Sequence, residues 1–301
     1  MSGVAWVFPG QGSQTVGMGK ALYESETAAR SVYEEADAAL GFALSRLCFD
    51  GPQAELDRTI NAQPALLVTS IAHLVSLRER GVALPHPQFL AGHSLGEYSA
   101  LVAGDALALD AAVRLVRARG AAMQAAGDGA AGGSGMAAII GADDATLAAV
   151  CSDCDVDLAN FNAPGQTVIS GSRAGIERAT ALAKERGARR VVPLAVSIAS
   201  HSRLMQPAAV QMAALLSDVA LESPVAPLVP NVTARPTLDP AEIRQLLVEQ
   251  LYSPVRWVES VQAMTAAGVT VFWEIGAGKV LAGLIKRIAP TATIENSEAY
   301  L

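Results

Sequence analysis

The sequence of 301 residues predicts an α/β protein, in which a large domain with a mostly parallel sheet carries an inserted small βαββαβ domain. Three observations support this prediction. Apolar strands alternate with helical patterns in the first part of the chain, as in layered α/β folds. A glycine-rich segment, residues 127–135, interrupts the alternation, and a shorter series of strands and helices follows it. We therefore expect a large domain at 1–126 and 197–301, with the small domain at 127–196.

The first part of the chain contains short apolar segments and longer helical patterns. Pro64 suits the first turn of a helix, because proline lacks the N–H that a first turn leaves unpaired. The expected elements are, in order, a strand at 4–8, helices at 26–40 and 64–80, a strand at 88–91, and helices at 97–103 and 110–126.

The segment after the glycine-rich stretch has the element order of a ferredoxin-like domain. We expect strands at 136–140, 155–161, 166–170 and 190–196, with helices at 144–150 and 173–186. The chain then returns to the large domain, with a strand expected at 269–275 and a helix at 279–288. The predicted architecture is thus a hydrolase-like α/β core with a ferredoxin-like insert.

Residues 127–132 match Gly-x-Gly-x-x-Gly, a pattern found in loops that bind dinucleotides. Such a loop must follow a strand and open a helix, whereas this segment follows a helix and precedes a strand. We therefore expect no dinucleotide here and no cofactor in the protein.

Composition and charge argue against several classes of protein. Hydrophobic residues make up 51% of the chain and charged residues 17%, which allows a sizeable core. The net charge of −7 argues against nucleic acid as a partner, because it repels phosphates. No uninterrupted apolar run approaches the roughly eighteen residues of a membrane span, and the N-terminal residues lack the basic region of a signal peptide. We expect a cytoplasmic protein.

The three cysteines, Cys48, Cys151 and Cys154, are too few for a disulfide framework. Cys151 and Cys154 match Cys-x-x-Cys, but a zinc site needs further ligands and no second pair exists. Cysteines of a helix end or loop are favoured over a redox pair, and no metal site is expected.

Gly92-His93-Ser94-Leu95-Gly96 matches Gly-x-Ser-x-Gly, the sharp turn between strand and helix that exposes a serine hydroxyl. The flanking segments agree, since an apolar strand precedes the turn and a helical pattern follows it. The serine would lie at a helix N-terminus, where free N–H groups stabilise negative charge. This context favours a nucleophile at Ser94 over an ordinary glycine–serine turn.

A serine nucleophile needs a base, and the chain has four histidines. His73 lies in a helical pattern and His86 between two prolines, so both suit structural or surface positions. His93 adjoins the serine, but neighbouring residues of such a turn point in different directions, so direct proton transfer between them is awkward. His201 follows the last expected strand of the insert, where a loop could return to Ser94, and is the best candidate.

No acidic residue between Ser94 and His201 stands out as the third member of a hydrolase triad. We therefore expect a Ser-His dyad whose imidazole is oriented by backbone carbonyls. A serine esterase or thioesterase is the alternative function of the same turn, and a binding protein with an inactive site is the third.

Eight fragments occur in a defined order along the chain. They are Phe8-Pro9-Gly10-Gln11-Gly12-Ser13-Gln14, Gln63-Pro64-Ala65, Gly92-His93-Ser94-Leu95-Gly96-Glu97-Tyr98, Arg119-Gly120-x-x-Met123-Gln124, Asn160-x-Asn162-Ala163-Pro164-Gly165-Gln166, Ser200-His201-Ser202-x-Leu204-Met205, Tyr252-Ser253-Pro254-Val255-x-Trp257 and Glu274-Ile275-Gly276-x-Gly278-Lys279-Val280-Leu281. Together they resemble the malonyl-CoA:acyl-carrier-protein transacylase family over essentially the whole chain. Each fragment is weak alone, but the ordered set is specific.

The resemblance implies roles for the residues that match. Ser94 would be acylated, His201 would be the general base and acid, and the backbone N–H groups of Gln11 and Leu95 would form the oxyanion hole. Arg119 would bind the free carboxylate of a malonyl group, which suits the planar fork of a guanidinium.

The resemblance also implies a set of residues around the substrate and the base. Three residues would line the pocket and form hydrogen bonds there: Gln63, His93 and Asn162. The residues near the α-carbon of the acyl group would be Met123, Val196 and Ser200. A backbone carbonyl near Ser253 would orient the histidine. The small side chain of Ser200 leaves methylmalonyl as an alternative donor, but malonyl is the first choice.

The implied activity moves malonyl from malonyl-CoA to the phosphopantetheine thiol of an acyl carrier protein, through a serine ester, for fatty-acid or polyketide synthesis. No cofactor is expected beyond these substrates, and the resemblance favours a monomer. Carrier proteins are acidic, so their docking face should be basic. The candidate basic residues are Arg189, Arg190, Lys286 and Arg287.

Overall fold

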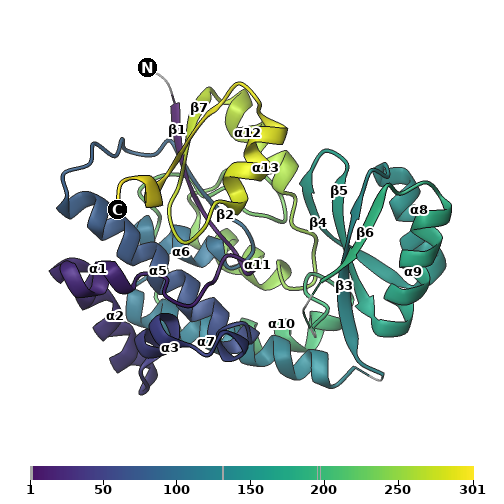
Figure 1. Cartoon of the computed structure of the whole chain (residues 1–301), viewed down its shortest axis with the longest axis horizontal. Coiled ribbons are helices and arrows are strands. Elements are labelled where there is room, and N and C mark those ends of the chain that lie inside the picture. The colour runs from purple at the N-terminus through teal and green to yellow at the C-terminus, as the bar shows by residue number, and fades with distance from the viewer. Residues whose placement is uncertain (1–2, 131, 195, 197) are drawn as a thin grey trace.

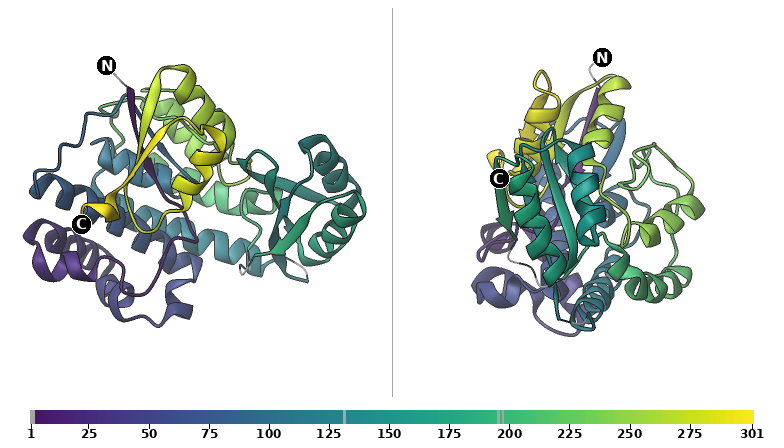
Figure 2. Two further views of the ribbon diagram at one scale, coloured as in Figure 1. Left: turned by 45° about the horizontal axis from the view of Figure 1, so that its top comes forward. Right: turned by 90° about the vertical axis from the view of Figure 1, so that its right-hand side faces the viewer.

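The computed structural model describes residues 3–130, 132–194, 196 and 198–301. Residues 131, 195 and 197 lie outside the described residues; they belong to the expected glycine-rich segment, the last expected strand of the insert and the expected boundary at 196/197. The chain forms two separate sheets (Figure 1). Figure 2 shows the second sheet, with two helices against it, beside the larger part of the molecule.

A four-stranded parallel sheet lies at the centre of the larger part. Its order is β2 (Phe89–Gly92), β1 (Gly3–Phe8), β7 (Val269–Glu274) and β8 (Thr293–Asn296). Alternate side chains of β1 enter two different core clusters, one on each face of the sheet. Because both faces of β1 are covered, the strand is apolar throughout, and this apolar run predicted it from the sequence. The edge strand β8 was not predicted.

The helices of the larger part are α1 (Lys20–Ser25), α2 (Thr27–Leu40), α3 (Leu44–Asp50), α4 (Gln53–Leu56), α5 (Thr59–Glu79), α6 (Gly96–Ala103), α7 (Leu109–Asp128), α10 (Gln206–Ser217), α11 (Pro240–Glu249), α12 (Trp257–Ala266) and α13 (Val280–Ile288). Short 3-10 turns occur at Arg203–Met205 and Ser297–Ala299. Helices α2, α6, α7 and α13 form where the sequence predicts them. Helices α1, α3, α4 and α10 to α12 were not predicted.

Helix α5 begins at Thr59, so the prediction that Pro64 opens it is wrong. A proline inside a helix leaves the carbonyl four residues earlier without its partner. Here that carbonyl belongs to Ile60, and the Arg117 guanidinium donates to it at 3.4 Å. Of the described helices, α5 alone is long and apolar enough to cross a membrane, but 89% of that stretch is buried inside the protein, as in a core helix.

The second sheet is antiparallel and has the order β4-β5-β3-β6. In chain order its elements are β3 (Ser134–Ile140), α8 (Asp144–Cys154), β4 (Val156–Ala163), β5 (Gln166–Ser172), α9 (Arg173–Glu185) and β6 (Arg190–Pro193). Helix α8 runs one turn beyond its expected end and β6 ends at Pro193, earlier than expected. The two helices cover one face, where Cys151 and Cys154 lie buried in a small apolar core. The other face carries Met136 and Val168 and closes the cavity described below.

The turn between β2 and α6 is packed too closely for side chains at its two glycines. A Cβ at Gly92 would overlap the carbonyl of Gly96, and a Cβ at Gly96 would overlap the carbonyl of Phe8 in β1. Ser94 between them has φ 52°, a left-handed conformation that non-glycine residues rarely adopt. The glycines therefore let the helix start directly against the sheet and force the serine outward.

The alanine variant of Gly92 should be strongly destabilised, because its new methyl group meets backbone that cannot move aside. We expect Gly92→Ala to unfold at least 10 °C below the unchanged protein in a thermal melt, or not to fold. The matched control is Gly283→Ala in α13, where the new Cβ meets no described atom within 4 Å apart from its chain neighbours and the nearby backbone of its own helix, and alanine favours the helix. Equal melting temperatures for the two variants would contradict the packing argument.

Candidate active site

A cavity of about 380 Å³ lies between the two sheets, and Ser94, His201 and Arg119 meet in it. Ser94 comes from the turn before α6, His201 from the segment after β6, and Arg119 from α7. The Ser94 hydroxyl lies 2.9 Å from Nε2 of His201 and 3.1 Å from Nη2 of Arg119. The structure therefore joins three residues that are far apart in the sequence at one oxygen atom.

His201 is fixed in the tautomer that suits a base. Its Nδ1 lies 2.8 Å from the backbone carbonyl of Gln250. A carbonyl only accepts hydrogen bonds, so Nδ1 carries the proton and Nε2 presents a lone pair to the Ser94 hydroxyl. The acceptor is thus Gln250 rather than the expected Ser253, whose backbone has only a smaller effect on the imidazole. Gln250 follows the last residue of α11, where helix carbonyls lack partners within the helix.

The imidazole is neutral in this environment. Burial, followed by the nearby positive charge of Arg119, lowers the pKa of His201 from 6.5 to about 3. Among the described residues, no carboxylate is hydrogen-bonded to His201, so no acid stands where a hydrolase triad has one. The arrangement is a Ser-His pair held by a main-chain carbonyl.

Arg119 is a buried cation that forms no ion pair in the part of the chain that the structure describes. Only 1% of its surface is exposed, and none of the ion pairs among the described residues includes it. Its guanidinium donates at 2.8 Å to each of the side-chain carbonyls of Gln63 and Gln250. Its Nε is buried and unpaired. Burying a charge without a counter-ion is costly, so this position indicates a site for an anion.

Two backbone N–H groups are available near the serine. Gln11 and Leu95 both line the cavity. Within the described parts of the chain, neither N–H donates a hydrogen bond. Leu95 precedes the first residue of α6, and the loop that carries Gln11 lies against the turn because Gly10 has no Cβ to strike the His93 carbonyl. Both groups are therefore free to bind an oxyanion.

The remaining expected residues also line the cavity, with the exception of Ser253. They are Gln63, His93, Met123, Asn162, Val196 and Ser200. His93 bonds across the cavity to Asn162 of β4 at 2.8 Å, and Gln63 donates to the sulfur of Met123 at 3.4 Å. Among the described residues, no group of three metal-ligating side chains is present.

Three buried residues at the site were missed. Gln250 and Asn231 bond to the turn from distant loops, and nothing in their local sequence marks them. Glu97 is part of the motif around Ser94, but its role was not identified. Its carboxyl accepts from the backbone N–H of Asn231, and burial raises its pKa from 4.5 to about 8.

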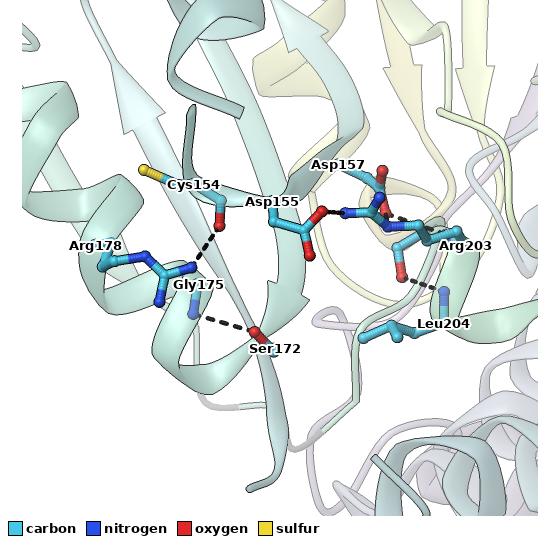
Figure 3. A network of polar contacts seen from close by, with 9 residues as sticks. Cys154, Asp155, Asp157, Ser172, Gly175, Arg178, Arg203 and Leu204 are labelled. Atoms are coloured by element: carbon cyan, nitrogen blue, oxygen red, sulfur yellow. Dashed lines mark hydrogen bonds and ion pairs between the residues drawn. The ribbon is translucent and has the colours of Figure 1, made fainter. Parts of the chain in front are cut away.

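The segment that carries His201 is tied to the second sheet by an ion-pair network (Figure 3). The Arg203 guanidinium lies 2.6 Å from Asp155 and 3.6 Å from Asp157, and the Arg203 backbone N–H donates to Asp157 at 3.1 Å. His201 has φ 59°, so its loop adopts an uncommon conformation two residues before this anchor. The anchor links the segment of His201 to β4, which contributes Asn160 and Asn162 to the lining of the cavity.

The low pKa of His201 predicts how the reactivity of Ser94 depends on pH. We expect labelling by a small sulfonyl fluoride, followed by intact-protein mass spectrometry, to proceed at a nearly constant rate from pH 8 to pH 5. An imidazole with a pKa of 6.5 would instead lose about 30-fold over that range, and such a loss would contradict the assigned environment. Ser94→Ala should not be labelled, and His201→Ala should be labelled slowly at every pH.

The sequence matches the acyl transferase domain family over residues 5–296. It is 50% identical to the malonyl CoA-acyl carrier protein transacylase of Bacillus subtilis, over 96% of this chain and 91% of that protein. The crystal structure of an acyl carrier protein S-malonyltransferase from Vibrio cholerae superposes with a TM-score of 0.93 at 45% identity, over 98% of this chain and 96% of the other.

A similar structure is that of a type II polyketide synthase acyl-carrier protein in complex with its malonyl-transacylase, with a TM-score of 0.93, 42% identity, and coverage of 98% and 96%. The matches span nearly the whole length of both partners in each comparison. The chain therefore belongs to the acyl transferase domain family and, within it, to the malonyl CoA-acyl carrier protein transacylases.

Proposed function

We propose that this protein transfers malonyl from malonyl-CoA to the phosphopantetheine thiol of an acyl carrier protein, for fatty-acid or polyketide synthesis. The observation that carries the proposal is the buried guanidinium of Arg119, which forms no ion pair among the described residues and lies 3.1 Å from the Ser94 hydroxyl. A thioester with a free carboxylate satisfies this cation and places its carbonyl beside the serine. The named relatives, which share the family, support the same substrates.

In the first half-reaction Ser94 attacks the thioester. The hydroxyl proton passes to Nε2 of His201 while Oγ bonds to the carbonyl carbon of malonyl-CoA. The resulting oxyanion accepts hydrogen bonds from the N–H groups of Gln11 and Leu95, each donor being worth about 10²–10³ in rate. The carbon–sulfur bond then breaks, His201 returns the proton to the sulfur, and CoA leaves with malonyl held as an ester.

In the second half-reaction the carrier thiol gives its proton to His201 and its sulfur bonds to the ester carbon. The ester bond breaks, and Ser94 takes the proton back. Arg119 assists both steps by holding the carboxylate so that the acyl carbon stays in line with the attacking atom. No cofactor takes part in this scheme.

The proposal also includes the type and the boundaries of the two domains. The order of the second sheet and its elements supports a ferredoxin-like domain at 127–196, inserted into a hydrolase-like domain at 1–126 and 197–301. We also propose a monomer that works in the cytoplasm.

The basic face proposed for the carrier protein needs one adjustment. Arg189 and Arg190 are exposed at the start of β6. Lys286 is exposed on α13 and donates to the carbonyl of Pro290 at 3.2 Å. Arg287 donates to the carbonyl of Pro164 at 2.8 Å and to the side chain of Gln166, so it ties α13 to the β4–β5 hairpin. Docking is therefore assigned mainly to the other three cations.

Removing the guanidinium of Arg119 should slow the acylation of Ser94 by malonyl-CoA more than its acylation by uncharged donors. We expect Arg119→Ala to lower the rate of Ser94 acylation by malonyl-CoA about 100-fold, since two charge-assisted hydrogen bonds are lost, and by acetyl-CoA less than tenfold. Quenched-flow mass spectrometry measures both rates. The matched control, Arg114→Ala, removes an exposed arginine of the same helix and should change neither. An equal loss for the two donors would refute carboxylate binding by Arg119.

Charge reversal should affect the carrier protein alone. We expect Arg189→Glu with Arg190→Glu, and separately Lys286→Glu, to raise the KM for the carrier protein at least fivefold and to leave the KM for malonyl-CoA unchanged. Steady-state transfer assays at low salt give both constants. Arg46→Glu, an exposed reversal on α3, serves as the control. An unchanged carrier-protein KM in all variants would exclude this face.

A further inference from the structure

Asn231 is fully buried beneath the turn that carries Ser94, and all its polar groups are bonded. Its side-chain Nδ2 donates to the Gly92 carbonyl at 2.7 Å, and its Oδ1 accepts from the Ser94 backbone N–H at 2.7 Å. Its own backbone N–H donates to the carboxyl of Glu97, and its carbonyl accepts from the N–H of Arg256 at 3.0 Å. The side-chain amide of Asn231 thus bonds to the backbone of the turn at both Gly92 and Ser94.

The two side-chain bonds continue a line of backbone bonds. The segment before Asn231 runs parallel to β2: the Leu90 N–H donates to the Pro227 carbonyl at 2.9 Å, and the Val229 N–H donates to the Leu90 carbonyl at 2.8 Å. β2 ends at Gly92, where the chain enters the turn, and the line of bonds continues there through the side chain of Asn231. The Asn231 amide, with a donor and an acceptor on one plane, takes the place of the next peptide group.

This replacement matters because the turn is strained. Ser94 has φ 52°, a left-handed conformation that is unfavourable for a residue with a Cβ. Such a conformation persists only where the surroundings fix it. The bonds of Asn231 lie on the residues that flank and include the strained peptide, and Gln250 adds a bond to the Ser94 carbonyl at 3.0 Å.

Glu97 contacts Asn231 from the helix that follows the turn. It is 1% exposed in the first turn of α6, and it accepts from the Asn231 backbone N–H. Glu97 follows Ser94 by three residues, so it links the helix that begins at the turn to the loop that supports the turn. Neither Asn231 nor Glu97 lines the cavity.

We propose that Asn231 is a positioning residue that holds Ser94 in its reactive conformation, and that Glu97 fixes Asn231 in place. The proposal rests on Ser94 being the nucleophile of the proposed function. It does not depend on which acyl group or thiol the protein uses.

The test measures how fast Ser94 reacts with a small sulfonyl fluoride, which contains neither malonyl nor CoA. The maximal labelling rate and the half-saturating reagent concentration are determined separately for Asn231→Ala. We expect the maximal rate to fall at least 30-fold and the half-saturating concentration to change less than threefold, in protein shown to be folded by its thermal melt. A merely structural residue would lower the melting temperature without this loss of rate in the folded protein.

The matched control is Asn61→Ala, since Asn61 is also a buried asparagine with two side-chain bonds, but it contacts Glu55 and Arg117 outside the cavity. It should keep the labelling rate of the unchanged protein. Labelling of folded Asn231→Ala within threefold of the unchanged protein would overturn the proposal.

Glu97 provides a second test if Asn231→Ala does not fold. Glu97→Ala removes the acceptor of the Asn231 N–H and should slow labelling at least tenfold. Glu97→Gln keeps an acceptor oxygen of the same length and should restore most of that rate. Equal labelling rates in the two Glu97 variants would overturn the proposal. If labelling behaves as expected but malonyl-CoA does not acylate Ser94, the proposed function fails and the positioning role stands.

Discussion

The polar centre of this protein depends on Gln250, a single residue just past the end of α11. Its backbone carbonyl orients His201, its side-chain oxygen accepts from Arg119, and its side-chain nitrogen donates to the Ser94 carbonyl. One residue thus sets the tautomer of His201, the direction of the Arg119 guanidinium and the position of Ser94. It takes the place of the triad carboxylate without adding a negative charge, which would compete with an anionic acyl group for the buried guanidinium.

The electrostatics of the cavity follow from that absence of charge. Burial, and after it the field of Arg119, which forms no ion pair among the described residues, keeps His201 neutral. In the proposed function, the carboxylate of the substrate binds Arg119 and offsets this field, so the substrate makes the imidazole a better proton acceptor when the serine must lose its proton. The same pairing favours donors that carry a free carboxylate over those that do not. In the proposed function, substrate selection and activation of the base therefore arise from one interaction.

Local patterns predicted much of the fold, because each depends on neighbouring residues. The buried strand β1, the turn at Gly92–Gly96 and the alternation of the second sheet are of this kind. The start of α5 was misjudged because a bond from Arg117 compensates for Pro64 inside the helix. The motif at 252–257 pointed to Ser253, whereas the free carbonyl lies at the helix end, on Gln250. Asn231 and Gln250 could not be found locally, because only folding brings them beneath Ser94.

The account is tested most directly by competition between acyl donors. The protein is offered malonyl-, methylmalonyl- and acetyl-CoA together in equal amounts, and the mass added to the Ser94 peptide is recorded before any carrier protein is present. The account predicts that malonyl is the main adduct and that Ser94→Ala carries none. Acetyl as the main adduct, or label that persists in Ser94→Ala, would contradict it.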